Sequence, residues 1–245
     1  MSSLSGCGVR VAGVQAADPP RAIRACWLSW IAVHGAGQGD LAARLGLTGV
    51  REVTWAQAQD LIDEAAHAGE GRFSTVVMTP AVEGWTLVIG AWCGLPYRER
   101  TAPVTRLCQQ LSSQYGKAQA YFDSEQNDGQ AWLIAENGTV IRRWITEYPE
   151  LALGEPFGAE RRLLDAYGIV GKPEDLDPAS NRAKEWAAGW GDCDALTIAA
   201  ESSLNPHQIG PRTHTSGAML AARTPPFAHP DPITDGASPT DPSRG

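Results

Sequence analysis

The apolar positions between residues 73 and 145 recur in a way that predicts strands around one helix. Phe73–Thr79 and Trp85–Ala91 are short apolar runs with a turn between them. Runs that are apolar on both faces are typical of strands near the centre of a sheet. Thr101 then opens a segment whose apolar residues recur at helical spacing, and Gly116 predicts its end.

Three further segments alternate between apolar and polar residues, and we expect three antiparallel strands there. They are Ala118–Asp123, Gln130–Glu136 and Thr139–Ile145. Asn137-Gly138 between the last two is a strong hairpin signal, because both turn positions need positive φ. A two-residue turn pairs Glu136 with Thr139, Ile134 with Ile141 and Trp132 with Arg143.

The segments before residue 73 favour helices. Asp18 is suited to cap a helix that Gly35 ends. One face of that helix would hold Ala22, Ile23, Cys26, Trp27, Trp30 and Ile31. A short helix over Asp40–Leu45 follows, and a capping box from Thr54 to Gln57 opens a helix that reaches about Ala68.

The C-terminal segments predict helices near Ala159–Tyr167, Ser180–Ala188 and Asp192–Ser203. Together the elements predict one α+β domain over residues 18–222, with an antiparallel sheet of about five strands in the order ββαβββ, covered by helices from both ends of the chain. Residues 1–17 are expected to be poorly ordered. Residues 223–245 form a Pro-rich tail with too little apolar content to fold.

Composition limits the class of protein further. The chain of 245 residues has 43% hydrophobic and 20% charged residues, and its nine Trp outnumber its four Phe. The formal net charge of −8 opposes binding to nucleic acid. We see neither a signal peptide nor a membrane span, and expect a cytoplasmic protein. The Ala-, Gly- and Arg-rich composition suggests a bacterial source.

The sequence contains no cofactor or metal motif. Its five Cys are widely spaced without a C-x-x-C pair, which favours free thiols over a disulfide framework or a zinc site. The glycine-rich segment Gly35–Asp40 has neither the ending of a phosphate-binding loop nor the spacing of a dinucleotide fingerprint. We therefore expect no cofactor and no metal.

Four residues near the end of the folded chain are the candidates for catalysis. His207 and His214 follow Asp192 and Asp194, and a His pair with carboxylates is suited to a general base or to a metal-dependent hydrolase. However, Asp192 is also suited to cap a helix and Asp194 to stand in its first turn. The histidines fall in a loop. Catalysis is therefore the alternative, and we do not expect an enzyme.

Aromatic and basic residues supply the candidates for binding. Trp186 and Trp190 stand four residues apart, and Trp is common in binding hot spots. Arg142, Arg143 and Trp144 are adjacent on the last predicted strand, where an arginine is placed to stack on a Trp. A pocket bordered by Trp85, Trp132 or Trp144 would instead indicate a small-ligand sensor.

The function that the sequence favours is binding without catalysis. We expect a bacterial protein-binding or regulatory protein whose partner is another protein. A toxin-neutralising (immunity) protein is a hypothesis within this class. An acidic surface suits a basic toxin, because complementary charge speeds the encounter. The oligomeric state does not follow from the sequence.

Overall fold

A computed structural model of the chain describes residues 18–124, 129–177, 179–183 and 194–226. The strands of these residues are β1 (Trp27–His34), β2 (Thr48–Val53), β3 (Thr75–Met78), β4 (Trp85–Ile89), β5 (Lys117–Ser124), β6 (Gln130–Glu136), β7 (Thr139–Ile145), β8 (Leu153–Gly154) and β9 (Met219–Arg223). They form one sheet in the order β2-β9-β3-β4-β1-β5-β6-β7-β8, and all neighbours are antiparallel. The predicted α+β class is confirmed, but the described sheet has nine strands, not about five.

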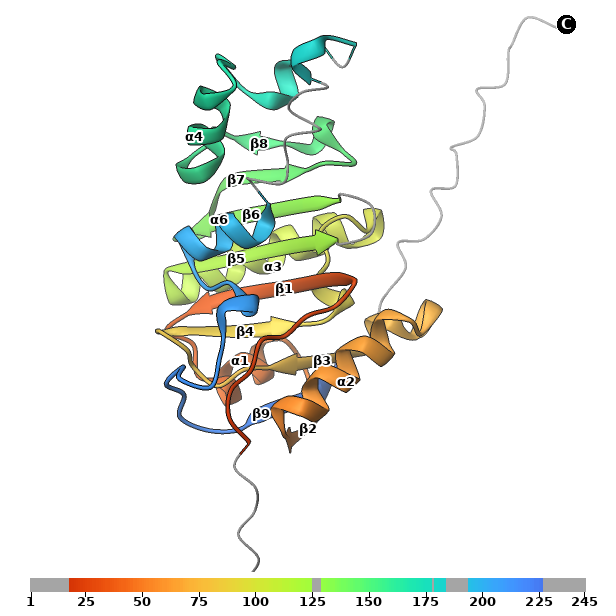
Figure 1. The fold of residues 1–245 in the computed structure, drawn as a ribbon. Coiled ribbons are helices and arrows are strands. Elements are labelled where there is room, and N and C mark those ends of the chain that lie inside the picture. The colour runs from red at the N-terminus through yellow and green to blue at the C-terminus, as the bar shows by residue number, and fades with distance from the viewer. Residues whose placement is uncertain (1–17, 125–128, 178, 184–193, 227–245) are drawn as a thin grey trace, which may run out of the picture.

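Helices cover both faces of the sheet (Figure 1). They are α1 (Gln38–Arg44), α2 (Trp55–Ala66), α3 (Arg98–Tyr115), α4 (Gly158–Ala166) and α6 (Ala195–Ser202). α1 and α3 pack into one core layer, which contains Leu41 and Val104. α2, α4 and α6 pack into the other, which contains Ile62, Leu164 and Ile198. The sheet lies between two separate apolar layers. A surface on one side of the sheet is therefore not in contact with a surface on the other side.

The first predicted helix is wrong, because residues 27–34 form β1 at the centre of the sheet. Leu28 and Trp30 belong to one core layer, and Ile31 and Val33 belong to the other. A strand buried on both faces has apolar residues at every position. Such a run also satisfies helical spacing, and periodicity therefore did not distinguish the two structures.

The hairpin at Asn137-Gly138 is confirmed, but its register is only partly as predicted. Both turn residues have positive φ, 48° and 84°, and Glu136 pairs with Thr139. The register shifts between Ile134 and Ala135, so that Ile134 pairs with Arg142 and Trp132 pairs with Trp144. The predicted pairs Ile134–Ile141 and Trp132–Arg143 are therefore wrong. A bulge adds one residue to one strand, and here it turns Arg142 and Trp144 toward the core layer that holds Trp132.

The capping box of α2 and the C-terminal end of α3 are confirmed, but the N-caps predicted for α3 and α6 are wrong. The hydroxyl of Thr54 accepts from the Gln57 amide, and the Gln57 side chain accepts from the Thr54 amide, which completes the capping box of α2. Gly116 ends α3 with a φ of 86°. α3 begins at Arg98, three residues before the predicted cap Thr101. Asp194, rather than Asp192, is the N-cap of α6, and its carboxylate accepts from the Thr197 amide.

Several predictions fall outside the described residues. These are the poor order of residues 1–17 and most of the tail over residues 223–245, and also the greater part of the helix predicted over Ser180–Ala188. The first residue of that tail, Arg223, is described and ends β9. The folded domain therefore includes at least this one residue beyond the predicted boundary at 222.

Candidate functional site

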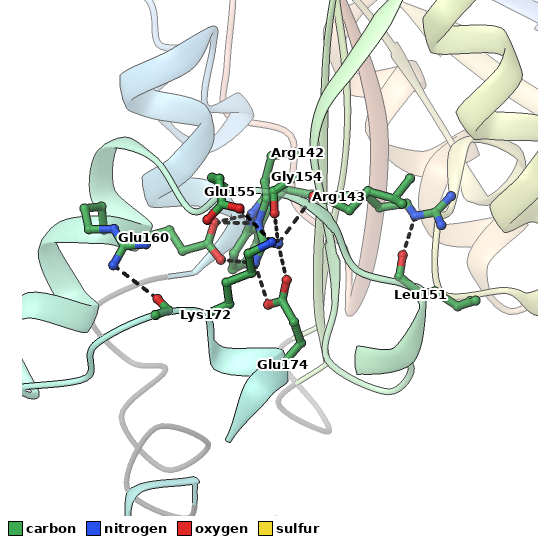
Figure 2. Close-up of polar contacts among 12 residues, drawn as sticks. Arg142, Arg143, Leu151, Gly154, Glu155, Glu160, Lys172 and Glu174 are labelled. Carbon is green, nitrogen blue, oxygen red and sulfur yellow. Dashed lines mark hydrogen bonds and ion pairs between the residues drawn. The ribbon is translucent and has the colours of Figure 1, made fainter. Parts of the chain in front are cut away.

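Arg142 of β7 is the centre of a buried ionic cluster rather than a surface contact (Figure 2). Its side chain is fully buried, as is that of Glu160 on α4. The guanidinium of Arg142 donates to Glu160 through Nε and Nη2, and to Glu174 through Nη1 (2.8 Å) and Nη2 (3.1 Å). Two carboxylates therefore share one buried cation, in the bidentate geometry that Arg favours.

Neighbouring groups complete this cluster. The indole Nε1 of Trp132 donates to Glu160 at 3.3 Å, and Arg142 Nη1 donates to the carbonyls of Leu153 and Gly154 on β8. The Trp144 ring lies under the guanidinium, 5.6 Å from ring centroid to Cζ, as the stacking hypothesis expected. The cluster ties β7 to β8, to α4 and to the turn that contains Glu174.

Burial and mutual hydrogen bonds shift the pKa values of Glu160 and Arg142 in this cluster. Burial raises the pKa of Glu160 above its ordinary value of 4.5, although its bonds from Arg142 oppose this. Burial alone would lower the pKa of Arg142, but the bonds to the two glutamates outweigh it and raise that pKa. Arg142 and Trp144 are both buried, so neither side chain is exposed at the surface of this structure. The role in binding that the sequence predicted for them stays a prediction.

Gly154 shows how closely β7 and β8 pack. Its φ is 74°, and a Cβ there would lie 1.8 Å from the carbonyl oxygen of Ile141. We expect Gly154→Ala to cost about 3 kcal/mol of unfolding free energy, because the clash adds to the cost of left-handed backbone. Gly168→Ala is the matched control, since Gly168 has a φ of 62° with open space around it. Urea denaturation of the two variants measures both costs, and equal losses would contradict the close packing.

The remaining predicted binding residues differ in their placement. Arg143 is half-buried and donates to the Leu151 carbonyl at 2.8 Å and to the Thr105 hydroxyl at 2.9 Å, which joins β7 to α3. Burial lowers the pKa of Arg143. Trp186 and Trp190 lie outside the described residues, so their predicted role stays a prediction.

The three catalytic candidates that the structure describes lie in three different local structures. His207 lies in a 3-10 turn over Pro206–Gln208, with Nδ1 3.5 Å from a guanidinium nitrogen of Arg24. His214 is exposed, Asp194 caps α6, and Asp192 is outside the described residues. No group of three or more His, Cys, Asp or Glu in the described ranges could hold a metal ion.

The tryptophans proposed to border a sensor pocket are core residues. Trp132 is fully buried, and Trp85 and Trp144 are 8% and 4% exposed. The rings of Trp132 and Trp144 lie 6.4 Å apart between centroids. All three side chains belong to the core layer that also contains residues of α2, α4 and α6.

The sequence did not indicate the open surface at the β2 edge of the sheet. β2 pairs with β9 on one side, and its first five residues are exposed, with Val50 at 45%. α2 leaves a groove between its outer side and β2, which we call the edge groove. It consists of two adjoining hollows of about 390 and 180 Å³, which share Arg51 and Leu61. The lining residues are Thr48, Gly49, Arg51, Gln57, Asp60, Leu61, Glu64, Thr75, Ala221, Ala222 and Arg223.

The edge groove is charged along its rim and apolar at its base. Asp60 and Glu64 are exposed on the α2 side, and Arg51 and Arg223 are exposed on the sheet side. Within the described ranges, none of these four side chains takes part in a salt bridge. Leu61 and Ala221 supply apolar surface between them. The edge groove therefore places charged groups of both signs beside apolar surface, next to an exposed edge strand.

Comparison of the chain with protein-family models, with curated proteins and with solved structures finds no match. Among the described residues, no helix combines the length and the apolar character that crossing a membrane requires.

Proposed function

We propose that this protein binds another protein, and that an extended segment of the partner adds to the sheet along β2. The observation that carries the proposal is the exposed β2 strand beside the charged edge groove. An edge strand presents backbone N–H and C=O groups that pair readily with another strand. Strand addition uses those groups for affinity and neighbouring pockets for specificity.

Charge indicates the chemistry of the partner. From Glu52 to Gly71 the chain has no Lys or Arg, and Asp60, Asp63 and Glu64 are all exposed on α2. A partner segment with Lys or Arg beside α2 would be attracted to this helix. The net charge of −8 also favours encounter with a basic protein. A toxin-neutralising role, in which a basic toxin is bound without catalysis, fits this chemistry.

The irregular shape of β2 supports a selective interaction. The pairing with β9 shifts between Thr48 and Arg51, and Gly49 within this bulge has a φ of 60°. Bulges bend an edge strand and discourage indiscriminate pairing. A partner must therefore match the regular part, Arg51–Val53, and the edge groove beside it.

A peptide selection on the full chain tests the proposal. Random peptides displayed on phage are selected on the immobilised protein, and amide hydrogen exchange is measured with the enriched peptides. We expect these peptides to carry basic and aliphatic residues and to slow exchange at the amides of Thr48–Val53, because strand addition gives them new hydrogen-bond partners.

A charge-reversed variant and a matched control sharpen this test. We expect Asp60→Lys/Glu64→Lys to weaken peptide binding at least about tenfold, because like charges would face each other. Asp165→Lys/Asp175→Lys changes the net charge equally at exposed positions away from α2, and should change binding much less. Unchanged exchange along β2, equal losses in both double variants, or a selection without enriched peptides would each refute the proposal.

A further inference from the structure

Three arginines gather on the opposite face of the sheet, in a hollow of about 230 Å³ between α1 and α3. We call this hollow the arginine groove. Its lining residues are Arg44, Leu45, Trp92, Arg100, Pro103, Arg106, Leu107 and Gln110. None of them is acidic, in a protein whose acidic residues outnumber its basic residues by eight. From this grouping we infer that the arginine groove binds a phosphate monoester.

Arg100 gives the groove a fixed, largely desolvated cation. It is 4% exposed, and its Nε and Nη2 donate to the backbone carbonyl of Trp92 at 2.9 and 2.5 Å. Its Cζ also lies 4.7 Å from the centroid of the Trp92 ring. Burial lowers the pKa of Arg100, but an arginine stays charged at neutral pH. Arg100 therefore lines the groove with a guanidinium whose orientation is fixed by the Trp92 carbonyl.

Arg44 and Arg106 extend the positive surface from the two helices. Arg44 is oriented by Asp40, 3.2 Å from Nε to Oδ2, and lies over the Tyr115 ring at 5.5 Å. The hydroxyl of Tyr115 donates to the same carboxylate. Arg106 is exposed and has no salt bridge with the described part of the chain. Arg106 is therefore available to a ligand, while Arg44 is pre-oriented by its neighbours.

The lining residues indicate a ligand with two parts, a phosphate group and an organic group attached to it. Planar guanidinium groups bind phosphate oxygens in pairs, and a phosphate monoester presents up to three such oxygens. Leu45, Pro103 and Leu107 supply apolar surface beside the cations. An organic group attached to the phosphate would pack on this surface. The same phosphate ester chemistry occurs in small metabolites and in phosphorylated side chains of proteins.

Titration of the full chain with phenyl phosphate, followed by NMR, tests the inference. We expect phenyl phosphate to bind more tightly than inorganic phosphate, to shift resonances of α1 and α3, and to lose affinity with added salt. Phenol should not bind. Absence of phenyl phosphate binding, or shifts confined to other elements, would overturn the inference.

Two single variants and a control locate the binding. We expect Arg106→Gln and Arg44→Gln each to weaken phenyl phosphate binding at least about fivefold, because each removes a charged donor. Arg212→Gln, an equal charge change at an exposed residue that does not line the groove, should weaken it less than about twofold. Equal effects of Arg106→Gln and Arg212→Gln would refute the groove as the site. Tighter binding of a phosphotyrosine peptide than of phenyl phosphate would identify a protein source, and the reverse a metabolite.

Discussion

Arg142→Met is expected to lower the free energy of unfolding by about 3–5 kcal/mol, because it leaves Glu160 buried beside Glu174 without a cation. The guanidinium also donates to the carbonyls of Leu153 and Gly154, so the variant loosens β8 as well. Urea denaturation at pH 7, followed by tryptophan fluorescence, measures the loss.

Arg143→Met is the matched control for Arg142→Met. Arg143 is the next residue on β7, but it is half-buried and donates to one carbonyl and one hydroxyl instead of to carboxylates. We expect it to cost about 1 kcal/mol, the ordinary value of lost hydrogen bonds. Arg142→Met/Glu160→Met should recover part of the loss, because replacing both partners removes the unpaired charge. Equal costs for the two single variants would show that the buried cluster contributes little to stability.

The loss in Arg142→Met should depend on pH. The pKa of Glu160 is raised in the folded protein, so its protonated form is the one that folding favours. The stability gained from that protonation is fully present below the unfolded value of about 4.5 and disappears as the pH rises through the folded pKa. Without Arg142 the folded pKa rises further. The difference between the variant and the wild type should therefore shrink as the pH falls toward 4.5, and a constant difference would contradict this reasoning.

Trp30→Ala is expected to cost about 3–5 kcal/mol, the usual cost of truncating a buried aromatic side chain. Trp30 is fully buried on the central strand β1, and its ring stacks on Tyr121, 5.0 Å apart between centroids with a 19° interplanar angle. The cavity would open in the core layer beneath α6, far from either edge of the sheet. Urea denaturation gives the cost.

Trp30→Phe separates ring packing from the indole N–H. Within the described residues the buried Nε1 of Trp30 has no hydrogen-bond partner. Phe keeps an aromatic ring on Tyr121 and removes that N–H, so the cost should fall to about 1–2 kcal/mol. A cost for Trp30→Phe as large as that for Trp30→Ala would show that the indole N–H has a partner after all.

The two proposed surfaces lie on independent parts of the fold. The edge groove lies on the α2 side of the sheet, and the arginine groove lies on the side that α1 and α3 cover. Opposite charge chemistry is expected at the two surfaces, a basic partner at α2 and an anionic ester at α3. Variants in one should leave binding at the other unchanged, so the failure of one proposal is distinguishable from the failure of the other.

Local signals were reliable where a few adjacent residues determine the structure. The capping box of Thr54 and Gln57, the turn at Asn137-Gly138 and the helix end at Gly116 all follow from backbone sterics and short-range hydrogen bonds. The shift within the β6–β7 hairpin was not predictable in this way. It depends on how Ile134 and Arg142 fit the core layer, which tertiary packing decides.

The candidate sites could not be predicted from local sequence patterns, because their residues are distant in the sequence and only the fold brings them together. Arg142 and Trp144 look like surface groups in the sequence, but Glu160 and Glu174, 18 and 32 residues away, convert Arg142 into a buried structural group. The arginine groove joins Arg44 to Arg100 and Arg106, which lie 56 and 62 residues further along the chain. Arg100, Pro103, Leu107 and Gln110 do recur at helical spacing on α3, which is the one signal that could have indicated part of this groove.

The sequence by itself determined the α+β class, the helices α1, α2, α3, α4 and α6, the strands from β3 to β7, and an acidic chain without a recognisable catalytic motif. Only the tertiary structure decided that residues 27–34 form the central strand and that β2 and β9 extend the sheet, through pairs such as Thr48 with Arg223. The physical reason is the sequence distance between the groups that must interact. Turns and caps are satisfied within a few residues, whereas a strand needs a partner from anywhere in the chain, and an apolar run fits either a buried strand or a helix until that partner is in place.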